Sequence, residues 1–216
     1  MILSFWRWLF FVLVWQLCVL LYLVISVIIP YDIDRGYLRE AIASVKAQTY
    51  GDWELIVERG LCRLGQNLNN AIKGARGEYI KVLAEDDLLT PDCLTILLKG
   101  IQGYDFVYSD AENFGDLKGW PPCSKDKTVT LESMLKGNGI HGGTTLYRRD
   151  MLIEVGCYDD SLCTGEEYDL HLKLLKNGYK HRHVPGIVYR YRLHDSNKSA
   201  ARNRHGEIEM IKKRYA

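Results

Sequence analysis

Three consecutive carboxylates, Glu85, Asp86 and Asp87, follow an apolar run and precede a Leu-Leu-Thr-Pro turn. Like charges this close repel one another, so their place at the end of a predicted buried strand calls for a neutralising partner. Carboxylate oxygens suit a hard divalent cation such as Mn²⁺ or Mg²⁺. The alternative is an acidic loop at the N-terminus of the next helix, where negative charge is favourable.

Two further acidic side chains are predicted at strand ends. Asp32 follows the apolar run 24–30, and Glu58 ends the run 53–58. The carboxyl ends of parallel strands share one sheet edge, and ligands bind there. Three acidic strand ends on one edge favour a bound cation over a solvated loop.

A second acidic group, Glu166, Glu167 and Asp169, begins a predicted helix directly after Gly165. A carboxylate within reach of a hydroxyl can act as a general base. Alternatively, all three are charges that complement the N-terminal end of the helix dipole.

Basic side chains gather near the end of the chain. Arg190, Arg192 and His194 alternate along a predicted strand and therefore share a face. Arginine suits phosphate, and histidine can ligate a metal or bond a phosphate oxygen, so we expect Arg190 and Arg192 to bind a phosphorylated ligand and His194 to bind the metal or that ligand. The alternative is ordinary surface charge.

Strand-like and helix-like segments alternate and must position these groups. This order predicts an α/β domain with a Rossmann-like, mostly parallel central sheet flanked by helices. The second half is less regular, with loops or a short hairpin expected over 111–140. The predicted strands are 24–30, 53–58, 78–84, 104–110 and part of 181–194, and the predicted helices are 35–48, 67–75, 90–101 and 165–180, with a short strand and helix over 144–156.

The first 23 residues are predicted to be a membrane anchor, because residues 8–25 carry no charge over about the length of a span. The alternative is an apolar segment buried in the fold. We expect a catalytic domain over 24–200 that faces the cytosol, and a basic helical tail over 201–216. Without a true span, the protein would be soluble and cytoplasmic. The 28 basic and 27 acidic residues argue against a nucleic-acid partner.

Four segments of the chain resemble the family 2 glycosyltransferases in their order and spacing. They are "VISVIIP" with "YLREAIASVKAQTYGDWELIV", "GARGEYIKVLAEDDLLTPDCL", "TTLYRRDMLIEVGCYDDSLCTGEEYDLHLKLLKNGY" and "YRYRLHDSNKS". The resemblance covers about residues 24–200. It implies the GT-A fold and inverting transfer of a sugar from a nucleotide diphosphate donor, with uridine the expected base, to a saccharide or glycoconjugate acceptor. It also implies Mn²⁺ or Mg²⁺.

The same resemblance implies roles for individual residues. Glu167 takes the place of the family's base, although glutamate stands where the family has aspartate. Asp86 takes the usual metal position, with Asp87 or Glu85 assisting. The residues implied to bind the donor are Pro30, Tyr31, Asp32, Glu58, Asn67, Glu85 and Asp86.

The chain departs from the family pattern at Tyr31-Asp32, where the family commonly has Thr-Tyr-Asn, and in three further places. Glu58-Arg59-Gly60 replaces Asp-Asp-Gly-Ser, Asn67-Leu68-Asn69 lacks an arginine near the donor, and Ala84 replaces the first aspartate of the metal motif. Two other functions therefore stay open: a sugar-1-phosphate nucleotidyltransferase, and an inactive module that binds nucleotide or carbohydrate.

Overall fold

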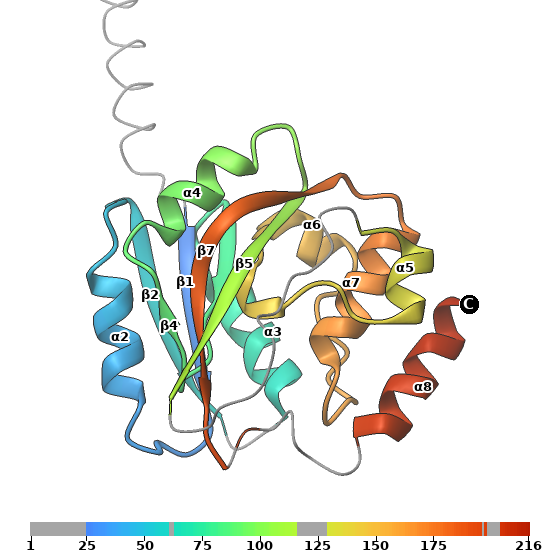
Figure 1. The fold of residues 1–216 in the computed structure, drawn as a ribbon, viewed down its shortest axis with the longest axis horizontal. Coiled ribbons are helices and arrows are strands. Elements are labelled where there is room, and N and C mark those ends of the chain that lie inside the picture. Colours follow the sequence, from blue (N-terminus) through green and yellow to red (C-terminus); the bar gives the residue numbers. More distant parts are fainter. Residues whose placement is uncertain (1–24, 61–62, 116–128, 196, 198–203) are drawn as a thin grey trace, which may run out of the picture.

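Figure 1 shows the fold in a computed structural model that describes residues 25–60, 63–115, 129–195, 197 and 204–216. The predicted membrane anchor at 1–23 lies outside these residues. Among the residues described, no helix is long and apolar enough to cross a bilayer.

A seven-stranded mixed sheet with the order β2-β1-β3-β6-β5-β7-β4 forms the centre of the molecule. The strands are β1 (Ile25–Tyr31), β2 (Trp53–Arg59), β3 (Tyr79–Val82), β4 (Leu88–Leu89), β5 (Phe106–Gly115), β6 (Leu146–Arg148) and β7 (His181–Leu193). The helices are α2 (Leu38–Lys46), α3 (Leu64–Gly74), α4 (Cys93–Gly100), α5 (Leu131–Lys136), α6 (Arg149–Glu154), α7 (Glu166–Lys176) and α8 (Arg204–Tyr215), with a 3₁₀ turn at Gly142–Thr144.

The predicted α/β fold class is confirmed, and the strand pairing adds detail to it. β1 runs parallel to β2 and β3, and β5 runs parallel to β7. β6 lies antiparallel between β3 and β5, and the two-residue β4 pairs antiparallel with β7. Because β3 ends at Val82, the three consecutive carboxylates lie in the turn between β3 and β4, where β7 can contact them.

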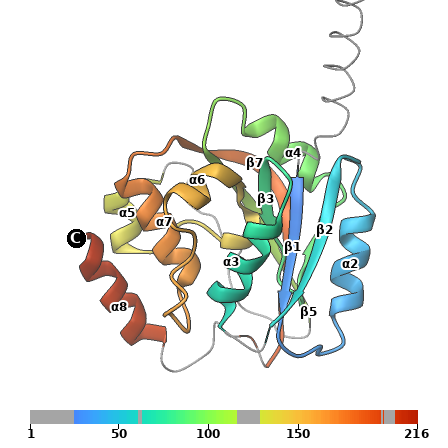
Figure 2. The same ribbon diagram turned by 180° about the vertical axis from the view of Figure 1, so that it is seen from behind.

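Helices cover both faces of the sheet, as Figures 1 and 2 show. Helices α2 and α4 bury Ala41, Val45, Leu94 and Leu97 against one face. On the other face α3, α6 and α7 pack together, and α8 lies outside α7 with Ile211 fully buried. The predicted basic tail is therefore a helix packed on the domain.

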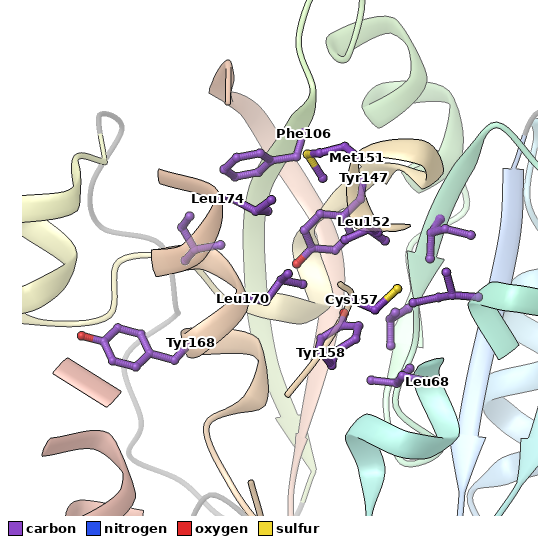
Figure 3. Packing of buried hydrophobic residues seen from close by; sticks show 14 of the residues in the cluster. Leu68, Phe106, Tyr147, Met151, Leu152, Cys157, Tyr158, Tyr168, Leu170 and Leu174 are labelled. Atoms are coloured by element: carbon purple, nitrogen blue, oxygen red, sulfur yellow. The ribbon is translucent and has the colours of Figure 1, made fainter. Parts of the chain in front are cut away.

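The core beneath α7 consists of large apolar side chains. Figure 3 shows Phe106 and Tyr147 from the sheet close to Leu152 of α6 and Leu170 of α7. Leu152 and Leu170 are fully buried, and each such side chain contributes about 1.5–3 kcal/mol of burial free energy. This packing fixes α7 and therefore the direction of its N-terminus, which carries the three predicted catalytic carboxylates.

Candidate active site

The turn that carries the three acidic residues is fastened to β7. Leu88 and Leu89 pair with Arg190 and Tyr189 in an antiparallel ladder, and the Asp87 amide donates to the Ala84 carbonyl over 3.2 Å. The chain therefore reverses sharply after β3. Each of the three carboxylates consequently lies in a different environment.

Asp87 points into the protein and is 2 % exposed. Its two carboxylate oxygens accept hydrogen bonds from the Tyr189 hydroxyl and the Arg192 amide, each over 2.7 Å. Burial, with a further contribution from the neighbouring Asp86, raises the pKa of Asp87 well above its usual value. Asp87 thus fastens the turn to β7, which is a structural task besides its predicted part in metal binding.

Asp86 points toward His194, the residue that follows β7. Their Oδ2 and Nε2 atoms are 2.9 Å apart, although the residues are 108 positions apart in the chain. Both side chains are largely shielded, with 18 % and 8 % of their surface exposed. The Tyr37 ring lies 5.3 Å from the imidazole. Two of the predicted metal ligands therefore meet at this edge of the sheet.

Glu85 lies beside Asp32 from the end of β1, and Arg35 lies between them. The Arg35 Nη1 atom is 2.5 Å from Glu85 and 3.2 Å from Asp32. Glu58 is opposite Pro30 in the register of β1 and β2, which puts the third acidic tip at the same edge. The predicted convergence of acidic strand ends is thus found, and an arginine that the sequence reasoning missed offsets two of them. The one feature of the sequence that could have indicated this ion pair is the position of Arg35, three residues after Asp32.

Arg190 and Arg192 of β7 are both engaged by other residues of the protein. Arg192 lies between the rings of Tyr37 and Phe114, at 4.4 and 4.5 Å, and its Nε atom donates to the Asp86 carbonyl over 2.7 Å. Arg190 forms an ion pair of 2.7 Å with Glu112. Arg192 therefore holds the backbone of Asp86 in place.

Tyr31 and Asn67 support the neighbouring strand ends. The Tyr31 carbonyl accepts from the Gly60 amide over 3.0 Å, and the Asn67 side chain donates to the Gly60 carbonyl over 3.3 Å. A Cβ at Gly60 would lie 1.8 Å from the Asn67 side-chain oxygen. Asn67 thus supports the chain just after Glu58, and a side chain at position 60 would displace the Asn67 side chain.

The three carboxylates of α7 also differ in surroundings. Asp169 is 1 % exposed and faces α8, where it accepts from the Tyr215 hydroxyl over 3.1 Å and lies 3.4 Å from Arg214. Glu166 is buried. Glu167 is half-buried and lies against the 3₁₀ turn, because a Cβ at Gly142 would come within 2.2 Å of its Oε2 atom. Of the three carboxylates, Glu167 is thus the one that lies against the turn Gly142–Thr144.

Within the described part of the chain, no group of three or more histidine, cysteine, aspartate or glutamate side chains is arranged to hold a metal ion. Asp86 and His194 nevertheless supply an oxygen and a nitrogen in contact. A Mg²⁺ ion that binds a nucleotide typically uses one or two carboxylates together with substrate phosphates. The pair fits such a site, in which the donor would complete the coordination.

Comparison with known proteins agrees with this geometry. The profile of "Glycosyl transferase family 2" matches residues 58–156. An uncharacterized glycosyltransferase of Rickettsia typhi is 27% identical, over 87% of this chain and 70% of the relative. One of Methanocaldococcus jannaschii is 24% identical, over 79% of this chain and 71% of that protein. Over residues 58–156 the chain is thus similar to glycosyl transferase family 2, and the relatives that it matches are glycosyltransferases.

Solved structures show the same fold. The S. aureus TarS fragment 1–349 in complex with UDP-GlcNAc superposes with a TM-score of 0.72 at 18% identity, over 87% of this chain and 64% of that one. Some sequence relatives are much longer, and the chain spans only 36% of a glycosyltransferase of Rickettsia felis.

Proposed function

We propose that this protein transfers a sugar from a UDP-sugar to a hydroxyl of a saccharide or glycoconjugate, with inversion at the anomeric carbon. The match to the profile of glycosyl transferase family 2 supports glycosyl transfer, and the structural neighbour determined with UDP-GlcNAc supports a uridine donor. The observation that carries the proposal is the meeting of Asp86 and His194 at the strand edge that also holds Asp32 and Glu58.

Each side of the site has its own task in this proposal. Asp32 and Glu58 bind the ribose and the base. Asp86 and His194 would hold Mn²⁺ or Mg²⁺, which supplies positive charge for the departing diphosphate. Arg35 lies beside Asp32 and Glu85 and keeps the acidic edge from repelling the donor.

On the acceptor side, Glu167 acts as the general base. Its carboxylate removes the proton of the acceptor hydroxyl while that oxygen bonds to the anomeric carbon and the bond from that carbon to the phosphate oxygen breaks. The products are the glycoside and UDP, and the proton remains on Glu167 until solvent removes it. A nearby proton acceptor is required because an alcohol is a poor nucleophile at neutral pH.

The test is release of UDP from a set of UDP-sugars, with Mn²⁺, with Mg²⁺ and after chelation. We expect UDP release that requires the divalent ion in the parent and is abolished in Asp86→Ala, while the variant keeps its fold by circular dichroism. Pyrophosphate release from UTP and a sugar-1-phosphate would instead identify a nucleotidyltransferase. Binding of UDP-sugar without any turnover would identify an inactive binding module.

A further inference from the structure

Lys81 is a charged residue in the centre of the sheet, on β3, and it is completely buried. Lysine is almost never fully buried unless it is paired. Its Nζ atom donates to the Val82 carbonyl over 3.1 Å and to the Gly143 carbonyl. It also lies 5.2 Å from the centre of the Tyr189 ring. None of these contacts belongs to the donor or acceptor chemistry proposed above.

The Gly143 carbonyl belongs to the 3₁₀ turn, so Lys81 ties this turn to β3. A Cβ at Gly143 would lie 2.3 Å from the Tyr189 ring, which shows how closely the turn packs on that ring. The Tyr189 hydroxyl in turn donates to Asp87 over 2.7 Å. One side of the turn is thus connected to the acidic metal motif.

The other side of the turn faces the proposed base. A Cβ at Gly142 would meet both carboxylate oxygens of Glu167, at 2.2 and 2.4 Å. The turn therefore fits between Tyr189 and Glu167 only because positions 142 and 143 lack side chains. Any displacement of the turn would move the surface on which the Glu167 carboxylate rests.

We propose that Lys81 is a positioning residue: it anchors the turn Gly142–Thr144, which seats the Glu167 carboxylate, and its charge favours the ionised form of that carboxylate. The inference rests on the proposed role of Glu167 as the base. It adds that Lys81 helps both to place the Glu167 carboxylate and to keep it ionised. Lys81 interacts electrostatically with Glu167, and burial lowers the pKa of Lys81 itself. A general base must be ionised before it can take a proton, so a protonated Lys81 raises the fraction of Glu167 that is active.

The buried tyrosines and His171 around Glu167 do not supply this charge. Tyr147 on β6 and Tyr158 before α7 interact with Glu167, and burial raises the pKa of each, so both are neutral. Burial lowers the pKa of His171, one turn along α7, to about 3, so it too is neutral near pH 7. Glu166 precedes Glu167 on α7, and His141 lies at the start of the turn.

The direct test is a pH titration of the Glu167 carboxyl group in the full-length chain, followed by NMR through the chemical shift of its carboxyl carbon. The signal is assigned by its disappearance in Glu167→Gln. Lys81→Met removes the charge and both donated bonds while it keeps the chain length. We expect the pKa of Glu167 to rise by on the order of one unit, as when an opposite charge is lost nearby. Lys173→Met is the matched control, because Lys173 also donates to a carbonyl, that of Cys157, but acts on Asp169.

An unchanged pKa of Glu167 in Lys81→Met, or an equal rise in Lys173→Met, would overturn the proposal. This readout needs no turnover, so it stays informative if the proposed transfer reaction fails in the parent. If the reaction proceeds, the acidic limb of the pH–rate profile should move upward by the same amount in Lys81→Met. Both results would separate an electrostatic role from a loss of stability.

If Lys81→Met does not fold, Gly142→Ala tests the contact between the turn and the Glu167 carboxylate. The added methyl displaces the Glu167 carboxylate, so we expect turnover to fall by roughly 10–100-fold while UDP affinity is unchanged. Gly137→Ala is the control, since a Cβ there meets nothing within 4 Å. A Gly142→Ala variant with parental turnover and a parental Glu167 signal contradicts the proposal.

Discussion

The contact between Tyr189 and Asp87 gives a sharp prediction of stability. Tyr189→Phe removes one hydroxyl and leaves the ring that packs against the 3₁₀ turn. That hydroxyl donates to the buried Asp87 carboxylate over 2.7 Å and accepts from the Ala84 amide over 3.3 Å. The change therefore takes a donor from a buried acid and an acceptor from a backbone N–H, without leaving a cavity larger than one oxygen.

The magnitude follows from these two bonds. A hydrogen bond to a charged group contributes about 1.5–3 kcal/mol, and a buried donor left unsatisfied costs about 1–3 kcal/mol. We expect the free energy of unfolding to fall by about 3–5 kcal/mol at neutral pH, measured by urea denaturation. Tyr50→Phe, on a half-buried tyrosine between α2 and β2, serves as the control and should change it by less than about 1 kcal/mol.

The pH dependence makes the test specific. Burial and the neighbouring Asp86 raise the pKa of Asp87 in the folded state, so its contribution to stability is present below the unfolded pKa and is lost as pH rises through the folded pKa. Tyr189→Phe withdraws a bond that favours the ionised form, so the pKa rises further. The deficit of the variant should therefore grow as pH rises through the folded pKa of Asp87 in the parent, and level off above the still higher pKa of the variant. A deficit that is independent of pH, or no larger than that of Tyr50→Phe, would refute this reasoning.

Three further predictions concern other parts of the molecule. Glu207 of α8 accepts hydrogen bonds from the amides of Cys163 and Thr164 over 2.9 and 2.7 Å. Glu207→Ala should therefore speed hydrogen exchange at these two amides, whereas Glu209→Ala on the same helix should not. Equal exchange in both variants would show that α8 does not hold this loop. Calorimetry should show tighter binding of UDP than of GDP or TDP, and a preference for GDP or TDP would overturn the uridine assignment alone. We propose that residues 1–23 hold the protein at a membrane, so removing them should leave a soluble, active domain, and an intact chain that needs no detergent would count against the anchor.

Much of the fold could be predicted because local signals agree with the tertiary structure. The β-branched run before Pro30 forms strand β1, an interior strand of the sheet that is buried on both faces as its composition indicates. The position of β6 could not be predicted in this way, because antiparallel insertion between β3 and β5 depends on pairing between residues far apart in sequence. The length of β5 was underestimated for the same reason, since its second half pairs along β7.

The candidate site, too, could be predicted from the sequence only in part. The motif at 85–87 and the alternation that ends at His194 pointed to one sheet edge, and the structure brings Asp86 and His194 into contact there. Charge alone did not reveal that Arg192 would be held between Tyr37 and Phe114. Arg35 was missed because an ion pair across 50 residues has no local pattern.

The central claim, inverting transfer with Glu167 as base, is tested most directly by Glu167→Gln. The substitution keeps the shape of the side chain and removes its ability to take a proton. We expect the variant to bind UDP-sugar and Mn²⁺ like the parent, by calorimetry, and to release UDP in single-turnover assays about 10²–10⁴ times more slowly. Parental turnover in Glu167→Gln, with loss of turnover in Glu166→Gln or Asp169→Asn instead, would contradict the assignment of the base.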